Sequence, residues 1–495
     1  MCGIVGYVGP APASTRGADI VMHGLKRLEY RGYDSAGIAV VGSADGQLQV
    51  RKKAGKLDNL IAELAARPLA GGTSAIGHTR WATHGVPSDA NAHPHVSADG
   101  KLALIHNGII ENFAALRTEL QLEGITLQSE TDTEVAAHLL ARAYDTCGDL
   151  TEAMRLVSAR LSGAFTLLAI HVDVPGVIVG ARRNSPLVIG QGDGENFLGS
   201  DVAAFIAETN RALEVDDDQI VTITADDIRV CDTEGQPVIP RAYTVDWDAS
   251  AAVKGGFGTF MEKEIHDQPA AVADTLLGRL DDDGHLRLDE LRIDEAVLRA
   301  VDKIIVIACG TAAYAGHVAK YAIEHWCRIP VEVELAHEFR YRDPIVNEKT
   351  LVVAISQSGE TMDTLMAVRH AREQGAKVLG ILNTHGATIA READAVLYTH
   401  AGPEVAVAST KAFLAQITAC YILGLYLAQL RGNMFADEIG AELDLLGQMP
   451  AKIQQVIDAE DDIIRVAKQM VDTSSVLFLG RHVGFPVALE GALKL

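Results

Sequence analysis

The chain opens with Met1-Cys2-Gly3-Ile4-Val5-Gly6-Tyr7, a short apolar run directly behind the initiator methionine. The run predicts a buried strand with Cys2 at its tip. Removal of Met1, which is usual before a small residue, would leave a thiol and a free α-amine on Cys2. Because an α-amine titrates about two units below a lysine, one residue would then carry both a nucleophile and a base. An ordinary small N-terminal residue is the alternative for Cys2 taken alone, but a terminus built into a sheet has the rigidity that catalysis needs.

Length and charge limit the possible classes of protein. A chain of 495 residues is too long for one domain and predicts two to four. Its formal net charge of −23 argues against a nucleic-acid or anionic-membrane partner, which requires a basic face, but permits a phosphorylated small molecule. The six cysteines form no CxxC pair, so reduced thiols in a cytoplasmic protein are expected. We find no signal peptide and no apolar run of membrane-spanning length.

The chain changes character near its middle. Before Arg241, strands predominate, and residues 134–144 predict a helix with Val135 and Leu139 on one face. Residues 243–258 lack apolar periodicity and predict a linker. Beyond them, short apolar runs alternate with helices, as a parallel sheet covered on both faces requires. The strands expected in the two regions are 37–41, 102–105 and 164–170, and then 304–308, 331–335, 351–355, 377–382 and 395–398.

A partial repeat extends this domain plan. Residues 303–311 and 475–481 each predict a strand followed by glycine and a helix, the second helix starting near Phe485. Since one strand and one helix leave apolar faces uncovered, we expect a second α/β domain that is incomplete at Leu495. The expected plan is an α+β domain at 1–242, a linker at 243–288, a doubly wound parallel α/β domain at 289–432 and the start of another at 455–495.

Polar residues in the first region predict a pocket for a small zwitterion. The clusters are residues 78–85, 91–95 and 106–108. Arg80 can bind a carboxylate through both guanidinium nitrogens, and Asp132 can hold an ammonium group. The Asn107 side chain and the Gly108 backbone N–H can stabilise an oxyanion. A polar surface loop is the alternative. The histidines lack HExxH or Cys/His ligand spacing, so no metal is expected.

Three turns in the second region predict an anion site. Residues 309–311, 356–361 and 408–411 each place Ser or Thr at the start of a helix. Helix capping is the common use of any one of them. Three such turns after parallel strands favour phosphate binding, because ligands gather at the carboxyl ends of these strands. No Walker A or GxGxxG motif is present, so no nucleotide and no other cofactor is expected.

Taken together, these motifs resemble the glutamine–fructose-6-phosphate aminotransferases (isomerising), a family of amino-sugar biosynthesis. The resemblance implies an N-terminal-nucleophile, class II glutamine amidotransferase sandwich followed by sugar-isomerase (SIS) domains that form a homodimer. It implies that glutamine releases ammonia, which passes through a channel to fructose 6-phosphate and gives glucosamine 6-phosphate, the first step of hexosamine synthesis. The segments that carry it are 2–6, 28–37, 78–85, 106–112, 356–361 and 408–411.

The same resemblance assigns expected roles. Cys2 is the nucleophile, its α-amine the base, and Asn107 and Gly108 the oxyanion hole. Glutamine is held by Arg80, Thr83, His84, His93 and Asp132, with Trp81 as the channel gate. The sugar phosphate is bound by Thr311, Ser356, Gln357, Ser358, Thr361, Val407, Ser409 and Glu490, with Lys494 catalytic and close to the sugar.

The resemblance has departures, and alternatives stay open. Ala312, His337 and Ala406 stand where many members have Ser, Ser and Gly. We expect the family's catalytic glutamate, ring-opening histidine and Schiff-base lysine to lie beyond Leu495. Other class II amidotransferases would need a pyrophosphate-binding loop that we do not find. A glutaminase alone and a non-enzymatic sugar-phosphate sensor are the remaining alternatives, and Cys2 argues against the sensor.

Overall fold

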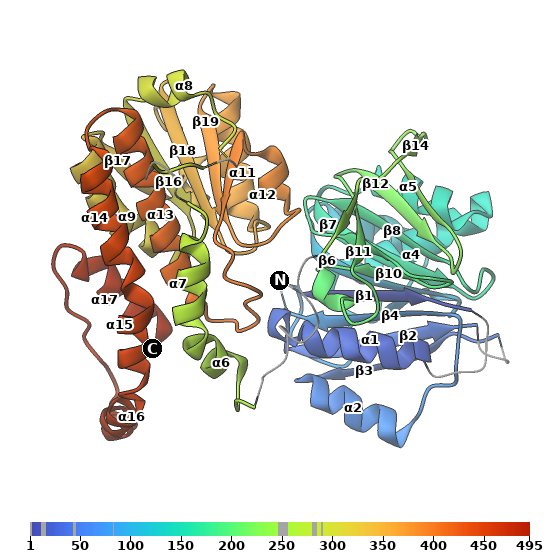
Figure 1. Ribbon diagram of the computed structural model, residues 1–495. Helices are drawn as coiled ribbons and strands as arrows, with labels where there is room; N and C mark the ends of the chain where they lie inside the picture. The colour runs from blue at the N-terminus through green and yellow to red at the C-terminus, as the bar shows by residue number, and fades with distance from the viewer. Residues whose placement is uncertain are drawn as a thin grey trace. The chain divides into compact units, whose positions relative to one another are not determined.

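The computed structural model describes residues 2–10, 16–42, 46–82, 84–245, 256–279, 285–288 and 291–495 (Figure 1). The chain divides into two compact units, residues 1–252 and 253–495. The first is rich in antiparallel strands, and the second alternates strands and helices. The division between the units, after residue 252, lies eleven residues beyond Arg241, near which the sequence changes character.

Unit 1 contains two antiparallel sheets. The first has eight strands in the order β15-β11-β9-β10-β1-β4-β2-β3, and the second has seven in the order β14-β13-β12-β8-β7-β6-β5. The first sheet comprises β1 (Gly3–Val8), β2 (Ser35–Val41), β3 (Gln49–Ala54), β4 (Ser74–Arg80), β9 (Val188–Gln191), β10 (Asn196–Gly199), β11 (Arg211–Glu214) and β15 (Ala242–Thr244). The second comprises β5 (His95–Val96), β6 (Leu102–Ile110), β7 (Gly163–His171), β8 (Ile178–Arg183), β12 (Gln219–Ile223), β13 (Ile228–Cys231) and β14 (Pro237–Val238).

The two sheets pack face to face between outer helices. Ile4 and Ile76 of the first sheet share an apolar core with Ile105 and Leu168 of the second. Helix α1 covers the other face of the first sheet, and α4 and α5 cover that of the second, which makes an α+β sandwich. The helices are α1 (Arg16–Arg27), α2 (Leu57–Ala66), α3 (Phe113–Leu122), α4 (Asp132–Cys147) and α5 (Leu150–Ser158), with short 3₁₀ turns η1 (Glu29–Arg31) and η2 (Val202–Ala204).

Helix α4 shows how local sequence sets a boundary close to the site. The Thr131 hydroxyl accepts a hydrogen bond from the Glu134 backbone N–H, which caps the helix N-terminus. Gly148 ends the helix at φ +68°, a left-handed conformation that glycine adopts without steric cost. The predicted helix at 134–144 is confirmed, and it starts two residues earlier at Asp132.

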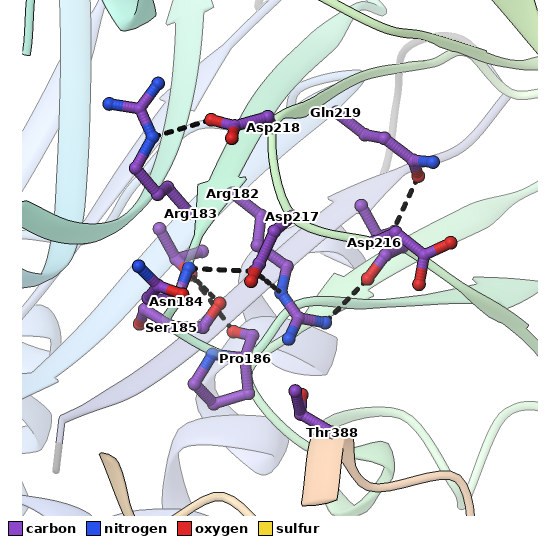
Figure 2. A network of polar contacts seen from close by, with 12 residues as sticks. Arg182, Arg183, Asn184, Ser185, Pro186, Asp216, Asp217, Asp218, Gln219 and Thr388 are labelled. Atoms are coloured by element: carbon purple, nitrogen blue, oxygen red, sulfur yellow. Dashed lines mark hydrogen bonds and ion pairs between the residues drawn. The ribbon is translucent and has the colours of Figure 1, made fainter. Parts of the chain in front are cut away.

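A network of arginines and aspartates fixes the turn before β12 (Figure 2). Arg182 of β8 is buried, and its Nε lies 3.3 Å from Asp217 Oδ1. Asp217 Oδ1 also accepts the Asn184 backbone N–H at 2.8 Å, and Arg183 Nε donates to Asp218 Oδ1 at 2.6 Å. Because Arg182 pairs with Gln219 in the ladder, these bonds hold the turn against the end of β8.

Unit 2 is built on a parallel sheet of five strands in the order β17-β16-β18-β19-β20. The strands are β16 (Lys303–Ala308), β17 (Val331–Leu335), β18 (Thr350–Ser356), β19 (Lys377–Leu382) and β20 (Ala395–Tyr398), so all five predicted strands are confirmed within one or two residues. The chain runs from β16 outward to β17, then returns to β18 on the other side of β16. This reversal is a topological switch point, where α/β domains bind ligands.

Helices cover both faces of this sheet. Helix α9 (Thr311–Cys327) and α13 (Lys411–Leu430) pack on one face, and α11 (Met362–Glu373) and α12 (Thr388–Glu392) on the other. The predicted doubly wound parallel α/β fold is therefore confirmed. The remaining helices of the described part of unit 2 are α6 (Phe260–His266), α7 (Gln268–Leu276), α8 (Glu295–Ala300), α10 (Ala336–Phe339), α14 (Ala436–Gly447), α15 (Met449–Ile457), α16 (Glu460–Gln469) and α17 (Gly484–Lys494).

Helix α13 corrects one expectation. By length and composition it is apolar enough to cross a membrane, although no run of that length was expected. It packs along α9, and Ala419, Ile422 and Leu423 lie in the core of unit 2. A helix surrounded by protein is apolar on most sides for the same reason that a membrane helix is, so here its apolarity reflects burial.

Two further expectations concern the ends of the α/β region. Residues 475–481 form no strand in the described chain, and Leu477 and Leu479 are exposed, so the predicted strand is wrong. Apolar residues form a strand only where a neighbour satisfies their backbone groups, and this segment has no paired strand. The helix expected near Phe485 is confirmed as α17.

The stretch expected as a linker, 243–288, includes α6 and α7, while residues 246–255, 280–284 and 289–290 lie outside the described residues.

Candidate functional site

Cys2 directly precedes β1, which pairs with β4 from its first residue, Gly3. Gly3 pairs with Thr79, which brings Cys2 beside the end of β4. A Cβ on Gly3 would lie 2.6 Å from Thr79 Oγ1 and 2.8 Å from Leu28 Cβ. The close packing therefore requires glycine directly after the cysteine, and it fixes the backbone that carries the thiol.

The Cys2 thiol faces the backbone of Trp81. The Trp81 N–H donates to Sγ at 3.1 Å, and Sγ lies 3.4 Å from the Trp81 carbonyl oxygen. Burial raises the pKa of the Cys2 thiol, and it outweighs the opposing effects of the Trp81 hydrogen bond and of the N-terminal charge. The thiol is thus protonated at neutral pH and needs a base before it can attack an electrophile.

Asn107 of β6 reaches Cys2 from the second sheet. Its Nδ2 donates to the Cys2 carbonyl oxygen at 2.8 Å, and its Oδ1 lies 3.0 Å from His78 Nε2. His78 Nε2 also lies 2.9 Å from the His106 carbonyl oxygen. Two acceptors at Nε2 place the ring proton there, and burial lowers the pKa of His78 to about 3, so the imidazole is neutral. The Asn107 amide is consequently held in one orientation.

Gly108 follows Asn107 in β6 with φ +119°, in the region that favours glycine. A Cβ at this position would lie 2.0 Å from the Ala164 carbonyl oxygen on β7. No other residue fits there without moving the strand. The turn of the backbone leaves Gly108 exposed beside the Asn107 amide.

Arg80 ends β4 and is only 3% exposed. Its Nη2 donates to the backbone carbonyl oxygens of His84 and Gly85, the second at 3.1 Å. Its Nη1 is buried without a hydrogen-bond partner among the described residues, and so is His84 Nδ1. Buried donors without a partner are costly, which makes this pair a natural place for an anionic ligand group.

Asp132 is the first residue of α4 and is also buried. Its Oδ2 accepts the Ile110 backbone N–H at 2.9 Å and lies 3.8 Å from His106 Nδ1. The carboxylate therefore connects the start of α4 to the end of β6, two residues beyond Gly108.

His93 lies in a group of buried histidines behind these residues. Its ring stacks on that of His78 with centroids 4.2 Å apart, and its Nε2 is 2.7 Å from Thr133 Oγ1. His106 Nδ1 contacts the same hydroxyl at 3.0 Å, and His95 lies edge-on to His93 at 4.9 Å. Burial lowers the pKa values of His93, His95 and His106, so they pack as neutral rings.

Of the remaining residues predicted in unit 1, Trp81 is 40% exposed and its ring meets Tyr33 edge-on at 5.3 Å. Thr83 lies outside the described residues. Sequence reasoning did not select His78, although the motif of residues 78–85 begins with it. The sequence around a histidine on a buried strand does not indicate its hydrogen-bond partner, because that partner, here Asn107, comes from the other sheet.

In unit 2, α17 brings two predicted residues to the start of α9. Lys494 Nζ lies 2.8 Å from Thr311 Oγ1 and 2.9 Å from Glu490 Oε1. Thr311 Oγ1 donates to Glu490 Oε1 at 3.1 Å. The three side chains thus form a closed polar cluster beside the carboxyl end of β16.

The turn at residues 356–361 follows β18, the neighbour of β16. Ser356 Oγ accepts the Gly359 N–H at 3.0 Å and lies 3.1 Å from Thr361 Oγ1, and Ser358 Oγ accepts the Glu360 N–H at 3.2 Å. The Gln357 carbonyl oxygen accepts the Asn383 N–H at 3.2 Å. Hydroxyls and helix N-termini from adjacent strands therefore meet at the switch point.

The third turn is organised by two glutamates that sequence reasoning missed. Glu404 accepts bonds from Ser409 Oγ at 2.8 Å and from the Thr410 N–H at 2.8 Å. Glu264 of α6 accepts the Val405 N–H, and burial raises its pKa to about 7. The loop that the two glutamates bind, residues 405–410, leaves Val407 61% exposed. The sequence gives only a weak indication of Glu404 and Glu264, because an isolated glutamate in a sequence does not show that it is buried.

Comparisons with known proteins agree with this division. The model of the glutamine amidotransferase domain family matches residues 67–236, and that of the SIS domain family matches residues 297–426. These matches and the two folds show a class II glutamine amidotransferase domain followed by a SIS-type α/β domain.

Several curated relatives match the whole chain. The glutamine–fructose-6-phosphate aminotransferase (isomerising) of Corynebacterium glutamicum is 69% identical over 499 residues, and that of Streptomyces coelicolor is 64% identical over 495. Each alignment covers 100% of this chain and 80% of the relative. A solved structure of the C-terminal domain of the Francisella tularensis enzyme is 38% identical, covering 49% of this chain and 68% of that one with a TM-score of 0.47. The chain belongs to the glutamine–fructose-6-phosphate aminotransferase (isomerising) family.

Proposed function

We propose that this protein transfers the amide nitrogen of glutamine to fructose 6-phosphate and forms glucosamine 6-phosphate and glutamate. The observation that carries the proposal is the group around Cys2, in which the thiol, the Asn107 amide and exposed Gly108 lie together at the edge of two packed sheets. A sugar-phosphate sensor has no use for such a group. The identity of 69% to a relative with this activity supports the second substrate.

The glutaminase step follows from the chemistry of Cys2. After removal of Met1, the α-amine takes the thiol proton, and the thiolate attacks the amide carbon of glutamine. The oxyanion that forms is stabilised by the second N–H of the Asn107 amide and by the Gly108 N–H. The C–N bond then breaks, ammonia leaves with a proton from the α-ammonium group, and water hydrolyses the thioester to glutamate.

We assign the recognition of glutamine to buried charged side chains and to buried nitrogen atoms that have no hydrogen-bond partner in the described structure. Arg80 Nη1 and His84 Nδ1 are unpartnered in the described structure and suit the α-carboxylate. Asp132 suits the α-ammonium group, and Thr83 and His93 complete the proposed set. Two opposite charges held at fixed positions select a zwitterionic amino acid over a simple amide.

The sugar phosphate is assigned to the switch point of unit 2. Ser356, Ser358 and Thr361 offer hydroxyls at the start of α11, where the helix dipole favours an anion. Gln357, Val407 and Ser409 are the further proposed contacts. Lys494, neutralised at rest by Glu490, is proposed to act beside the sugar together with Thr311.

Three further features are part of the proposal. Trp81 acts as the gate through which ammonia leaves the glutamine site, since it carries the N–H that contacts Cys2 and a partly exposed indole. The enzyme is cytoplasmic, and at full length it is a homodimer that associates through its α/β domains. Light scattering of the purified protein tests the dimer, and a monomer at micromolar concentration would contradict it.

The test of the function is nitrogen transfer. The full-length protein, which includes the glutamate, histidine and lysine expected beyond Leu495, is incubated with glutamine labelled with ¹⁵N in the amide and with fructose 6-phosphate. The proposal expects ¹⁵N in the amino group of glucosamine 6-phosphate, and Cys2→Ala should abolish both this product and glutamate release. Glutamate release without labelled amino sugar would instead support a glutaminase acting alone. Fructose 6-phosphate binding without glutamate release would support the sensor.

A further inference from the structure

A second group of chemically reactive side chains lies in unit 2 and has no role in the proposed function. Cys309, His337 and Asp363 each offer one potential metal-ligand atom, and the three atoms lie within 4.8 Å of one another. Cys309 Sγ is 3.9 Å from His337 Nδ1. No other group of this kind, with three or more His, Cys, Asp or Glu side chains, was found among the described residues.

The three residues come from three separate elements. Cys309 follows β16, His337 lies in α10, and Asp363 lies in the first turn of α11. Sequence distances of 28 and 26 residues separate successive members, so the fold alone brings them together. Cys309 also lies 3.9 Å from Thr364 Oγ1, which places the thiol against the start of α11.

The donor set matches the preferences of zinc. Thiolate sulfur, imidazole nitrogen and carboxylate oxygen are its usual protein ligands, at about 2.0–2.3 Å from the metal. In a tetrahedron of that size the ligand atoms lie about 3.5 Å apart. The Cys309–His337 separation is close to this value, and His337, with a side chain 45% exposed, is free to turn toward a metal.

The surroundings of His337 support the same conclusion. Its other ring nitrogen, Nε2, lies 4.0 Å from Glu338 Oε1. A metal-bound histidine usually gives its second N–H to a carboxylate, which fixes the tautomer and strengthens the ligand. Nδ1 would then face the metal, and Nε2 would face Glu338.

We propose that Cys309, His337 and Asp363 form a binding site for a zinc-class divalent cation. Binding replaces the Cys309 thiol proton, which passes to solvent, and leaves an S–metal bond, while two negative charges and one neutral imidazole surround the cation. Three protein ligands leave one tetrahedral position for water or another oxygen ligand. The bound cation joins α10 to the turn that follows β16 and to the first turn of α11, so it stiffens one rim of the switch point.

The test uses Co²⁺ as a spectroscopic probe and Zn²⁺ as a competitor, with the whole protein. Co²⁺ should give a near-ultraviolet thiolate charge-transfer band that one equivalent of Zn²⁺ removes. Cys309→Ser should abolish the band. His337→Ala and Asp363→Asn should weaken Zn²⁺ affinity by at least about 100-fold, more than the 10- to 100-fold typical of losing an outer partner. Cys147→Ser, which removes an exposed thiol of unit 1, is the matched control and should change neither.

A measurement on the unaltered protein guards against variants that fail to fold. Zn²⁺ should protect Cys309 from alkylation and leave alkylation of Cys147 unchanged, as read by mass spectrometry. A Co²⁺ band that survives Cys309→Ser but is lost in Cys2→Ala would overturn the site. Zn²⁺ affinity that is equal in the wild type and in all three variants would overturn it as well.

Discussion

His78 Nε2 lies 3.0 Å from Asn107 Oδ1 and 2.9 Å from the His106 carbonyl oxygen, so a strand of one sheet orients the amide that reaches Cys2 from the other. Only the Nε2–H tautomer satisfies both acceptors, and the Asn107 Nδ2 is then directed to the Cys2 carbonyl oxygen. Among the described residues, no hydrogen bond joins His78 to Cys2. We therefore regard it as a positioning residue for the proposed oxyanion hole.

Replacing His78 by Phe should lower kcat for glutamine hydrolysis by about 10- to 100-fold, below the 10²- to 10³-fold cost of deleting an oxyanion donor outright. The ring stack with His93 is retained, but the N–H that orients Asn107 is lost. KM for glutamine should change little, because recognition is assigned to other residues. Steady-state glutaminase kinetics measure both parameters.

The matched control is His138→Phe, which alters an equally buried histidine whose Nε2 faces Glu134 at 3.6 Å instead of Asn107. Its effect on kcat should be much smaller. His78→Gln, which keeps an N–H donor, should recover part of the activity. If both His78 variants retained the kcat of the wild type, the positioning role would be wrong.

A glutamine analogue that acylates thiols should label Cys2 and no other cysteine. The described structure places only this thiol beside the Asn107 amide, whereas Cys327 and Cys420 are buried and Cys147 is exposed on α4. Peptide mapping identifies the labelled residue. Protein that retains Met1 should be inactive as a glutaminase, since its first peptide bond removes the proposed base. Labelling of Cys309 or Cys147 in place of Cys2 would contradict the assignment.

Arg80→Lys should raise KM for glutamine strongly. Loss of a charge-assisted hydrogen bond costs about 1.5–3 kcal/mol, roughly ten- to a hundred-fold in kcat/KM. Lysine keeps the charge, but a single ammonium cannot bond the His84 and Gly85 carbonyls and a ligand in the same fork geometry. Arg67→Lys, at an exposed arginine paired with Glu63, is the control and should leave the kinetics unchanged. Unaltered glutamine kinetics in Arg80→Lys would disprove the carboxylate role.

How well the sequence predicts an element of this molecule depends on how far apart in the chain the contacting residues lie. Helix α4 and strands β16 to β20 follow from local apolar runs and caps, which a sequence displays directly. The order β17-β16-β18 depends on how crossovers pack, and this order is what makes residues 309–311 and 356–361 neighbours.

The errors and omissions have the same origin. Residues 475–481 have the composition of a strand but pair with no strand among the described residues, and α13 has the composition of a membrane helix but lies inside a domain. The links from His78 to Asn107 and from Glu264 to Val405 span 29 and 141 residues. No local pattern encodes such contacts, because each exists only once the layers have packed.

The buried histidines predict that unit 1 loses stability in mild acid. Burial lowers the pKa of His78 from 6.5 to about 3, and those of His93 and His95 lie well below 6.5. Below pH 6.5 the unfolded chain therefore binds protons that the folded state does not, so the free energy of unfolding falls as pH falls. Each such histidine contributes about 1.4 kcal/mol per pH unit between 6.5 and its folded pKa.

Hydrogen exchange of the β4 and β6 amides from pH 8 to 5 measures the slope. His78→Phe should reduce it by about one proton. Protection that is flat from pH 7 to 5 would show that the histidines are charged in the folded protein.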